Sequence, residues 1–347
     1  MFRTRFSGLL TGVVLSAGLV WGAAVAADHT HGYADHPAAQ PFISEMVSEG
    51  FDEAEIRAVL GSAERQDSII KAISRPAEKR LNWGEYRNIF LRDKRINQGV
   101  EFWNEYQDAL QRAERVYAVP AQIIVAIIGV ETRYGRNMGS YRVVDSLSTL
   151  GFDYPPRGKF FQGQLKEYFY LVREEHADPF SLKGSYAGAM GFGQFIPSSF
   201  RNFAVDFDGD GKKDIWNNPV DAIGSVANYF SAHGWRTGEP VRSNVVMEQL
   251  ADESWINADL KPQLTLAQWS ERGIRTRTDL NAENKAILLR LETEGEFQHW
   301  FGLQNFYVIT RYNHSPLYAM AVYELSEAVA AKRNQLLADQ SGGAQVK

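Results

Sequence analysis

A single carboxyl group at the end of an apolar helix is the first candidate for chemistry in this sequence. Glu131 follows an apolar run and lies in Gly-Val-Glu-Thr-Arg-Tyr-Gly, residues 129–135. Pro120 can begin the helix, because the first helical position needs no N–H, and Gly135 can supply the left-handed residue that ends it. Burial and the negative end of the helix dipole would both raise the pKa of Glu131 and keep it protonated as a general acid. The structural alternative is an ion pair between Glu131 and Arg133.

A glycine-rich segment is the second candidate. Residues 184–193 contain four glycines, which allow positive φ angles and close approach of the backbone to a neighbouring group. Gln194 follows directly, and its amide can both donate to and accept from a sugar hydroxyl or acetamido group. A tight loop packed on the core is the alternative interpretation.

An acidic segment, residues 206–221, has the first half of a calcium-binding loop. The expected oxygen donors and the glycine of such a loop are Asp206, Asp208, Asp210, Gly211 and the carbonyl of Lys212. Position 12 should be Glu but is Asn217, so Asp214 or Asp221 must supply the missing ligand. We expect a cation with a structural role, because the loop has no evident open position for a substrate. Alternating Asp and Gly in a solvated turn is the other interpretation.

Composition excludes several classes of function. The chain has 347 residues, enough for two or three domains, and its 44% hydrophobic and 23% charged residues are ordinary for a globular protein. The net charge of −5 provides no basic field, so we expect no nucleic-acid partner. The absence of cysteine excludes disulfides, a thiol nucleophile, thiolate metal sites and a lipid anchor on an N-terminal Cys.

The N-terminus has the pattern of an export signal. Arg3 and Arg5 precede an uncharged stretch, residues 6–27, and Ala-Val-Ala at 24–26 is typical of a cleavage site. We therefore expect a signal peptide, residues 1–26, and a periplasmic protein. The alternative is an uncleaved membrane segment, because the stretch is long enough to span a bilayer.

The sequence predicts a mainly α-helical (α+β) protein. Helices are expected at 120–134, 160–176, 219–233 and 316–337. Strands are expected at 241–247, 264–266, 286–291 and 306–310, with Trp269 in a helix between them. The predicted organisation is a signal peptide (1–26), a flexible N-terminus (27–41), a helical domain (42–116), a central segment with the three motifs (117–238), a small α+β domain (239–308), a returning C-terminal helix (309–340) and a flexible tail (341–347).

Taken together, these motifs resemble the lytic transglycosylase B family (glycoside hydrolase family 103), periplasmic enzymes that cleave peptidoglycan. The resemblance extends from about Phe42 to Glu327. It rests on residues 129–135, 188–198, 206–221 and the Thr-Arg-Tyr-Asn-His-Ser segment at 310–315, which occur in the family's order.

The resemblance implies a fold and a set of site residues. The fold is a lysozyme-like core with an EF-hand-like calcium site, between a helical domain and a small β-containing domain. Glu131 would be the sole catalytic acid and base. The implied substrate-binding residues are Gln194, Asn313, Ser185, Tyr229, Tyr312, Tyr318, Tyr86 and Arg157. The implied calcium ligands are Asp206, Asp208, Asp210, Lys212 through its carbonyl, and Asp221.

The implied activity is cleavage of the β-1,4 bond between N-acetylmuramic acid and N-acetylglucosamine, with a 1,6-anhydromuramic acid end as the product. A two-carboxylate glycosidase would need a second acid; Asp145 and Asp153 are nearest in sequence and belong to no motif. The alternatives are a muramidase that hydrolyses the same bond and a non-catalytic calcium-binding protein that binds peptidoglycan. We expect a monomer whose partners are glycan strands of peptidoglycan, with structural Ca2+ and no cofactor for the chemistry.

Overall fold

The computed structural model describes residues 32–74 and 81–343, so the predicted signal peptide (1–26) lies outside the described residues. The helices are α1 (Gln40–Ser48), α2 (Glu53–Gly61), α3 (Asp67–Ile73), α4 (Trp83–Phe90), α5 (Asp93–Glu105), α6 (Gln107–Tyr117), α7 (Ala121–Thr132), α8 (Val143–Phe152), α9 (Gly158–Glu174), α10 (Pro197–Phe203), α11 (Pro219–Ala232), α12 (Leu266–Glu271), α13 (Gln304–Tyr312) and α14 (Pro316–Gly343), with short 3-10 turns η1 (Pro37–Ala39), η2 (Pro155–Arg157) and η3 (Glu253–Trp255). The strands are β1 (Tyr141–Arg142), β2 (Lys183–Gly184), β3 (Arg242–Met247), β4 (Leu264–Thr265), β5 (Ile274–Thr276), β6 (Lys285–Thr293) and β7 (Glu296–Gly302).

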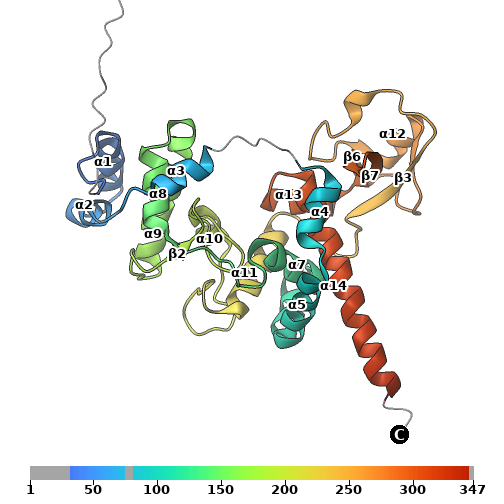
Figure 1. Cartoon of the computed structure of the whole chain (residues 1–347), viewed down its shortest axis with the longest axis horizontal. Coiled ribbons are helices and arrows are strands. Elements are labelled where there is room, and N and C mark those ends of the chain that lie inside the picture. The colour runs from blue at the N-terminus through green and yellow to red at the C-terminus, as the bar shows by residue number, and fades with distance from the viewer. Residues whose placement is uncertain (1–31, 75–80, 344–347) are drawn as a thin grey trace, which may run out of the picture.

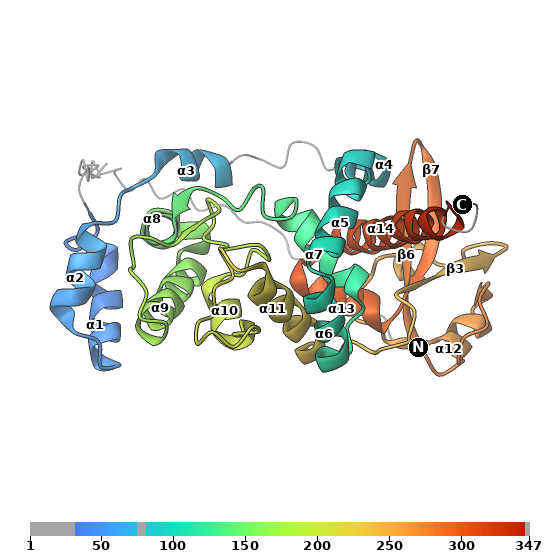
Figure 2. The same ribbon diagram turned by 90° about the horizontal axis from the view of Figure 1, so that it is seen from below.

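The molecule is elongated. It is mainly helical, as the sequence predicts. Helices α1 and α2 lie at one end, the five-stranded sheet lies at the other, and α7 lies between them (Figure 1). The view from below shows the same order along the long axis (Figure 2). Among the described residues no single helix is long and apolar enough to cross a membrane, although α6 and α7 pass that test as a pair bent by 115°.

Helix α7 is the central helix of the core. Its side chains from Ile123 to Ile128 are all buried, because α5, α6, α11 and α14 surround it and cover every face. A helix that is apolar all round is stable only in such a position. The predicted bounds, 120–134, are close: Pro120 is the N-cap, one residue before the helix, and Thr132 is the last helical residue.

The predicted helical domain, residues 42–116, does not pack as one unit. Helices α1 to α3 pack near α8 and α9, through ring contacts such as Phe42 with Phe152 at 5.9 Å between centroids. Helices α4 to α6 pack instead against α7, α11 and α14, on the other side of the core (Figure 2). Helical periodicity shows which face is apolar but not which partner covers it, so the sequence did not reveal this division.

The predicted flexible N-terminus, residues 27–41, is also too long. Tyr33 is 2% exposed, its hydroxyl donates to Asp153 at 2.6 Å, and Ala39 is fully buried, so this part of the segment is anchored on the core. At the other end of the chain, α14 continues to Gly343, which makes the first residues of the predicted tail (341–347) helical.

The small sheet has the strand order β4-β6-β7-β3-β5 and is antiparallel throughout. Helix α12 packs against β4 and β5 and contributes Trp269 to a second small core. The strands predicted at 241–247, 264–266 and 286–291 are confirmed. The strand predicted at 306–310 is wrong, because these residues lie in α13, where Phe306 and Ile309 are buried and the helix packs on α14. Tertiary packing overrides the β-propensity of this run.

Candidate active site

Glu131 lies in the last turn of α7, as predicted, and the residue is half-buried. One carboxylate oxygen, Oε1, accepts a hydrogen bond of 2.5 Å from the hydroxyl of Tyr318, near the start of α14. No ion pair between described residues joins Glu131 to Arg133, so the structural alternative does not hold. The carboxyl group is therefore available for a ligand.

The surroundings of Glu131 favour its protonated form. Burial raises the pKa of this carboxyl group from 4.5 to about 7, and the hydrogen bond from Tyr318 opposes the shift. Tyr318 and Tyr312 are themselves neutral donors, because burial and the Glu131 charge raise the pKa of both phenols well above the ordinary value. A carboxyl group with a pKa near neutrality can both give and take a proton.

The turn directly after α7 has an unusual backbone conformation. Arg133, Tyr134 and Gly135 all have positive φ angles, of 51°, 60° and 82°. The helix therefore ends earlier than the predicted stop at Gly135. Two successive non-glycine residues in this region are unusual and indicate a backbone that the surrounding packing holds in place.

Tyr134 supplies that packing. Its ring lies between α5 and α7, where a Cβ on Gly99 or Gly129 would come within 2.5 Å or 2.6 Å of its hydroxyl oxygen. Only glycines leave room for the ring, so both glycines position the helix end. Tyr134 and Gly129 belong to the motif around Glu131, but nothing in the sequence indicates the part of Gly99.

Thr132 connects this helix end to the glycine-rich loop. Its hydroxyl, which is fully buried, lies 2.9 Å from the carbonyl of Phe192 and accepts from the N–H of Gly135 at 3.0 Å. A Cβ on Gly135 would lie 2.3 Å from the Phe192 ring, so the loop packs closely on the turn. Sequence reasoning missed Thr132, although it follows Glu131 directly.

The glycines of the glycine-rich loop allow it to pack closely on the core, in agreement with the interpretation of this segment as a tight loop. Gly188 and Gly191 have positive φ angles, and a Cβ on either would collide with Leu147 or Ile215. Gln194 also has a positive φ, of 51°. Its side-chain amide donates to the carbonyls of Met138 and Gly191, at 3.2 Å and 3.0 Å, which leaves its own oxygen free to accept.

Three of the predicted substrate-binding residues, Tyr318, Tyr312 and Tyr86, lie near Glu131. The hydroxyl of Tyr312 donates to the carbonyl of Gly193 at 2.5 Å, which ties α13 to the residue before Gln194. Tyr86, on α4, is close enough that the Glu131 charge adds to burial in raising the pKa of its phenol. Asn313 follows Tyr312 at the end of α13 and is exposed.

Among the described residues, Tyr229, Ser185 and Arg157 make their contacts with groups other than Glu131. Tyr229 is 7% exposed and packs behind Tyr312, edge to face at 4.7 Å between centroids. Ser185 turns its oxygen into its own loop, where it accepts from the N–H of Ala189 at 3.1 Å. Arg157 is exposed at the start of α9, with its guanidinium 4.4 Å from the centroid of the Phe160 ring. No contact between described residues joins Arg157 to Glu131.

Neither nearby acid can be a second catalytic carboxylate in this arrangement. Asp145 is 3% exposed and forms an ion pair of 2.8 Å with Arg142. Asp153 accepts from Tyr33 and lies 3.7 Å from Arg65. Within the described residues, no acidic side chain contributes to the pKa shift of Glu131. The site thus has one acid and several neutral hydroxyl and amide groups.

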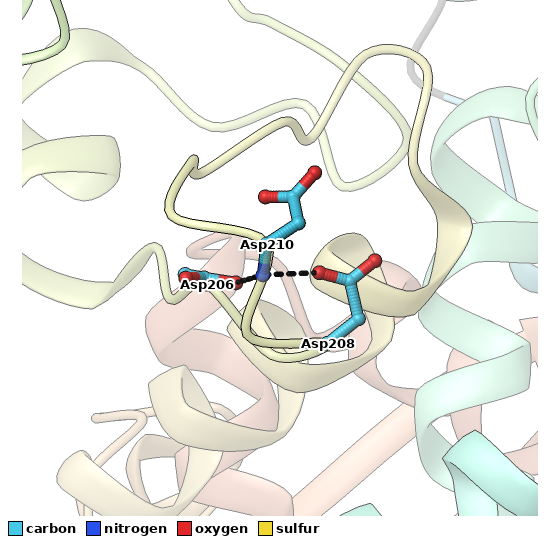
Figure 3. Close-up of side chains that lie close together, drawn as sticks. All are labelled: Asp206, Asp208 and Asp210. Atoms are coloured by element: carbon cyan, nitrogen blue, oxygen red, sulfur yellow. Dashed lines mark hydrogen bonds between the residues drawn. The ribbon is translucent and has the colours of Figure 1, made fainter.

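The predicted calcium loop brings three acids together. The carboxylates of Asp206, Asp208 and Asp210 each offer an oxygen, and these oxygens all lie within 4.8 Å of one another. Asp206 and Asp208 flank the backbone N–H of Asp210 and accept from it at 3.1 Å and 3.2 Å (Figure 3). Three like charges so close together repel one another, and a divalent cation would relieve that repulsion. The donor set therefore fits Ca2+.

The sequence predicts Asp214 or Asp221 as the last ligand of the loop, and these two side chains have different contacts. The side-chain amide of Asn217 donates to Asp214, at 3.1 Å to Oδ2, so these two side chains are paired with each other. Asp221 is fully buried and accepts from the N–H of Phe207 at 2.7 Å and of Asp214 at 2.9 Å, and so it closes the loop. Each carboxylate oxygen has two acceptor sites, so Asp221 keeps a lone pair for an ion.

The comparison with protein families and curated proteins gives one consistent result. The family described as Transglycosylase SLT domain matches residues 34–327. The membrane-bound lytic murein transglycosylase B of Escherichia coli strain K12 is 46% identical over 313 residues, which are 87% of this chain and 85% of that protein.

Solved structures with the same fold belong to the same group. The soluble lytic transglycosylase SltB1 of Pseudomonas aeruginosa has a TM-score of 0.82 and 52% identity, over 86% of this chain and 100% of that one. The Escherichia coli lytic transglycosylase Slt35 in complex with calcium has a TM-score of 0.79 and 45% identity, over 88% and 97%. SltB3 of Pseudomonas aeruginosa, in complex with NAG-anhNAM-pentapeptide, has a TM-score of 0.74 and 30% identity, over 84% and 78%.

Proposed function

This chain belongs to the Transglycosylase SLT domain family, and from that premise we propose how its residues carry out the reaction. The protein is a lytic murein transglycosylase, a glycan lyase that cleaves the bond between N-acetylmuramic acid and N-acetylglucosamine in peptidoglycan and forms 1,6-anhydromuramic acid ends. The residue-level proposal rests above all on one observation: Glu131 is a desolvated carboxyl group at the end of α7 that accepts a hydrogen bond from Tyr318 and has no acidic neighbour among the described residues.

In the first step, protonated Glu131 is the general acid. It gives its proton to the glycosidic oxygen, the bond from that oxygen to C1 of the muramyl sugar breaks, and the bonding electrons leave with the oxygen. The positive charge that develops at C1 has no carboxylate partner among the described residues, so the substrate's own acetamido oxygen stabilises it. The hydrogen bond from Tyr318 then stabilises the new Glu131 carboxylate.

In the second step, ionised Glu131 is the general base. It takes the proton from the C6 hydroxyl of the muramyl sugar, and the C6 oxygen forms a bond to C1. The 1,6-anhydro ring closes and Glu131 recovers its proton, so no water is consumed. Orientation of the hydroxyl is essential, because an intramolecular attack is fast only from a near-attack geometry.

The neighbouring polar groups would hold the sugar. The free oxygen of Gln194 and the exposed amide of Asn313 are suited to hydroxyl and acetamido groups of the muramyl residue. Tyr86 would contact the strand from α4, and Tyr312 and Tyr229 support the site from behind. Ser185 and Arg157 would contact the strand further from Glu131.

Substitution of Glu131 by Gln tests the assignment. The amide has the same shape but cannot transfer the proton, so we expect release of soluble fragments from purified peptidoglycan to fall by a factor of about 100 or more. An unchanged circular dichroism spectrum controls for folding. Activity within a few-fold of wild type would exclude Glu131 as the acid.

Mass analysis of the wild-type digest separates this reaction from hydrolysis. A muramidase would give reducing muramyl ends, whereas the anhydro product is lighter by one water. A non-catalytic wall-binding protein would release no fragments at all.

We also propose that Ca2+ binds the acidic loop and stabilises the fold. Asp206, Asp208, Asp210 and Asp221 would hold it, together with the carbonyl of Lys212. The homologous Slt35 structure in complex with calcium supports binding. The loop also joins other elements of the core: Arg112, on α6, donates to the carbonyl of Phe207 and lies 4.0 Å from its ring centroid. Binding of the ion would therefore stabilise the contact between the loop and α6.

The site of action would be the periplasm, where peptidoglycan is accessible. The relatives include proteins described as membrane-bound and as soluble. We propose that the exported protein acts as a monomer on glycan strands.

A further inference from the structure

A strongly basic pocket lies beside the residues that carry Glu131. It has a volume of about 410 Å3 and is lined by Ile89, Arg92, Lys94, Arg95 and Arg133. These residues come from the end of α4, the start of α5 and the turn after α7. We call it the basic pocket.

No carboxylate neutralises the basic pocket within the described part of the chain. Arg92 donates from Nε to the carbonyl of Asn88 at 2.8 Å, and Arg95 donates from Nη1 to the carbonyl of Gly129 at 3.0 Å. The ion pairs between described residues include none of the four basic side chains. Asp93, the acid in this run of sequence, is not among the lining residues.

The positive charges lie close enough to affect one another. Burial lowers the pKa of the Arg95 guanidinium, and the charges of Arg133 and Arg92 lower it further. The first N–H groups of α5, a helix of 13 residues, add positive potential at the same place. Such a group of cations without a carboxylate partner favours the binding of an anion at this place.

The basic pocket is connected to the catalytic residue in three ways. Arg133 follows Glu131 by two residues and has the positive φ of the turn. Arg95 holds the carbonyl of Gly129, two residues before Glu131. Ile89 lies three residues after Tyr86 on α4, on the same helix face. A strand that contacts Glu131 and Tyr86 would therefore pass beside the basic pocket.

We propose that the basic pocket binds free carboxylates of the peptide stems on the strand being cleaved. This inference rests on the proposed function, because peptidoglycan stems are acidic and only a substrate held at Glu131 brings them here. Arg guanidinium groups bind carboxylates through two parallel hydrogen bonds. Ile89 is 43% exposed and offers an apolar surface to the alkyl part of a stem residue. The net charge of −5 argues against a general role in collecting anions.

The test compares two substrates and two double variants of the full chain. The substrates are glycan strands with their peptide stems and the same strands after an amidase has removed the stems. One variant combines Arg92→Gln with Lys94→Gln. Among the described residues, neither side chain forms a hydrogen bond to the last turn of α7, which carries Glu131. The matched control combines Arg275→Gln with Arg277→Gln, two exposed cations of the small sheet domain.

The expected result is a loss of preference for stems. In the pocket variant, the ratio of kcat/KM for stem-bearing over stem-free strands should fall on the order of tenfold, mainly through KM, as expected for loss of charge-assisted hydrogen bonds. The control should keep the wild-type ratio. Arg92→Lys with Lys94→Arg, which keeps both charges, should restore most of the preference.

Other outcomes would overturn the proposal. An unchanged ratio would show that the basic pocket does not contact stems. A weaker binding to vesicles of anionic phospholipid, with the ratio unchanged, would assign the basic pocket to a membrane surface instead. Failure of the proposed function would be distinguishable from both of these outcomes, because the Glu131→Gln variant would then still cleave the two substrates.

Discussion

Replacement of Glu131 by Gln should stabilise the fold, and more strongly at high pH than at low pH. The raised pKa means that the folded protein holds the proton of Glu131 more tightly than the unfolded chain does. The folded state is therefore penalised as pH rises: the penalty begins near the unfolded pKa of 4.5 and is complete above the folded pKa of about 7. Glutamine is neutral at every pH and avoids this penalty.

The magnitude follows from the size of the shift. A change from 4.5 to about 7 corresponds to at most about 3 kcal/mol, at about 1.4 kcal/mol per pKa unit. Linkage places about 1 kcal/mol of this penalty at pH 5 and nearly all of it at pH 8. The stabilisation by Glu131→Gln should thus be about 2 kcal/mol larger at pH 8 than at pH 5. Any effect of the amide that does not depend on pH cancels in this difference.

Urea unfolding at the two pH values, followed by tryptophan fluorescence, measures this difference. Glu271→Gln, at an exposed carboxyl group at the end of α12, is the control and should show no such change. If the two pH values gave the same stabilisation by Glu131→Gln, the carboxyl group would titrate alike in the folded and unfolded chains, and the argument for a general acid would lose its physical basis.

Three further predictions concern the neighbours of Glu131, the ion loop and the backbone. Tyr318→Phe removes the hydrogen bond that lowers the pKa of Glu131, so the fall in kcat above about pH 7 should move to higher pH, and a profile that moved the other way would contradict this. Chelation should lower the melting temperature and added Ca2+ should restore it, as linkage requires; a melting curve indifferent to both would reject the ion site. Gly163→Ala, in α9 with open space around its Cβ, should stabilise the protein by about 1 kcal/mol in urea unfolding. Gly139→Ala should destabilise it markedly, because φ is +90° and the Cβ would lie 2.1 Å from the Gly184 carbonyl oxygen; equal effects at the two glycines would refute this.

Two predictions from the sequence failed for the same physical reason. Residues 306–310 are rich in β-branched and aromatic side chains, yet they form part of α13 because that helix packs on α14. The described residues between 42 and 116 are mainly helical as predicted, yet their helices divide between two sides of the core. In both cases the local sequence correctly predicts which residues are buried, but it does not indicate which element packs against them.

In the candidate site, too, the sequence predicts the local features but not the contacts between distant segments. The motif around Glu131 suffices to place an acid in the last turn of a buried helix, and the spacing of Asp206, Asp208 and Asp210 suffices to group three carboxylates, since both are local patterns. Arg133 is different: the sequence leaves a pairing with Glu131 open as an alternative, whereas the structure places Arg133 in the basic pocket.

Neighbouring residues are enough to indicate a buried helix that ends in one carboxyl group, because apolar periodicity and a helix stop signal are local patterns. The raised pKa of this group, about 7, depends instead on the packing of distant segments. The hydroxyl that contacts it belongs to Tyr318, 187 residues further along the chain, and the burial that shifts it comes from helices brought together from the whole fold. Desolvation depends on every group that displaces water from a site, and such groups have no fixed spacing in the sequence.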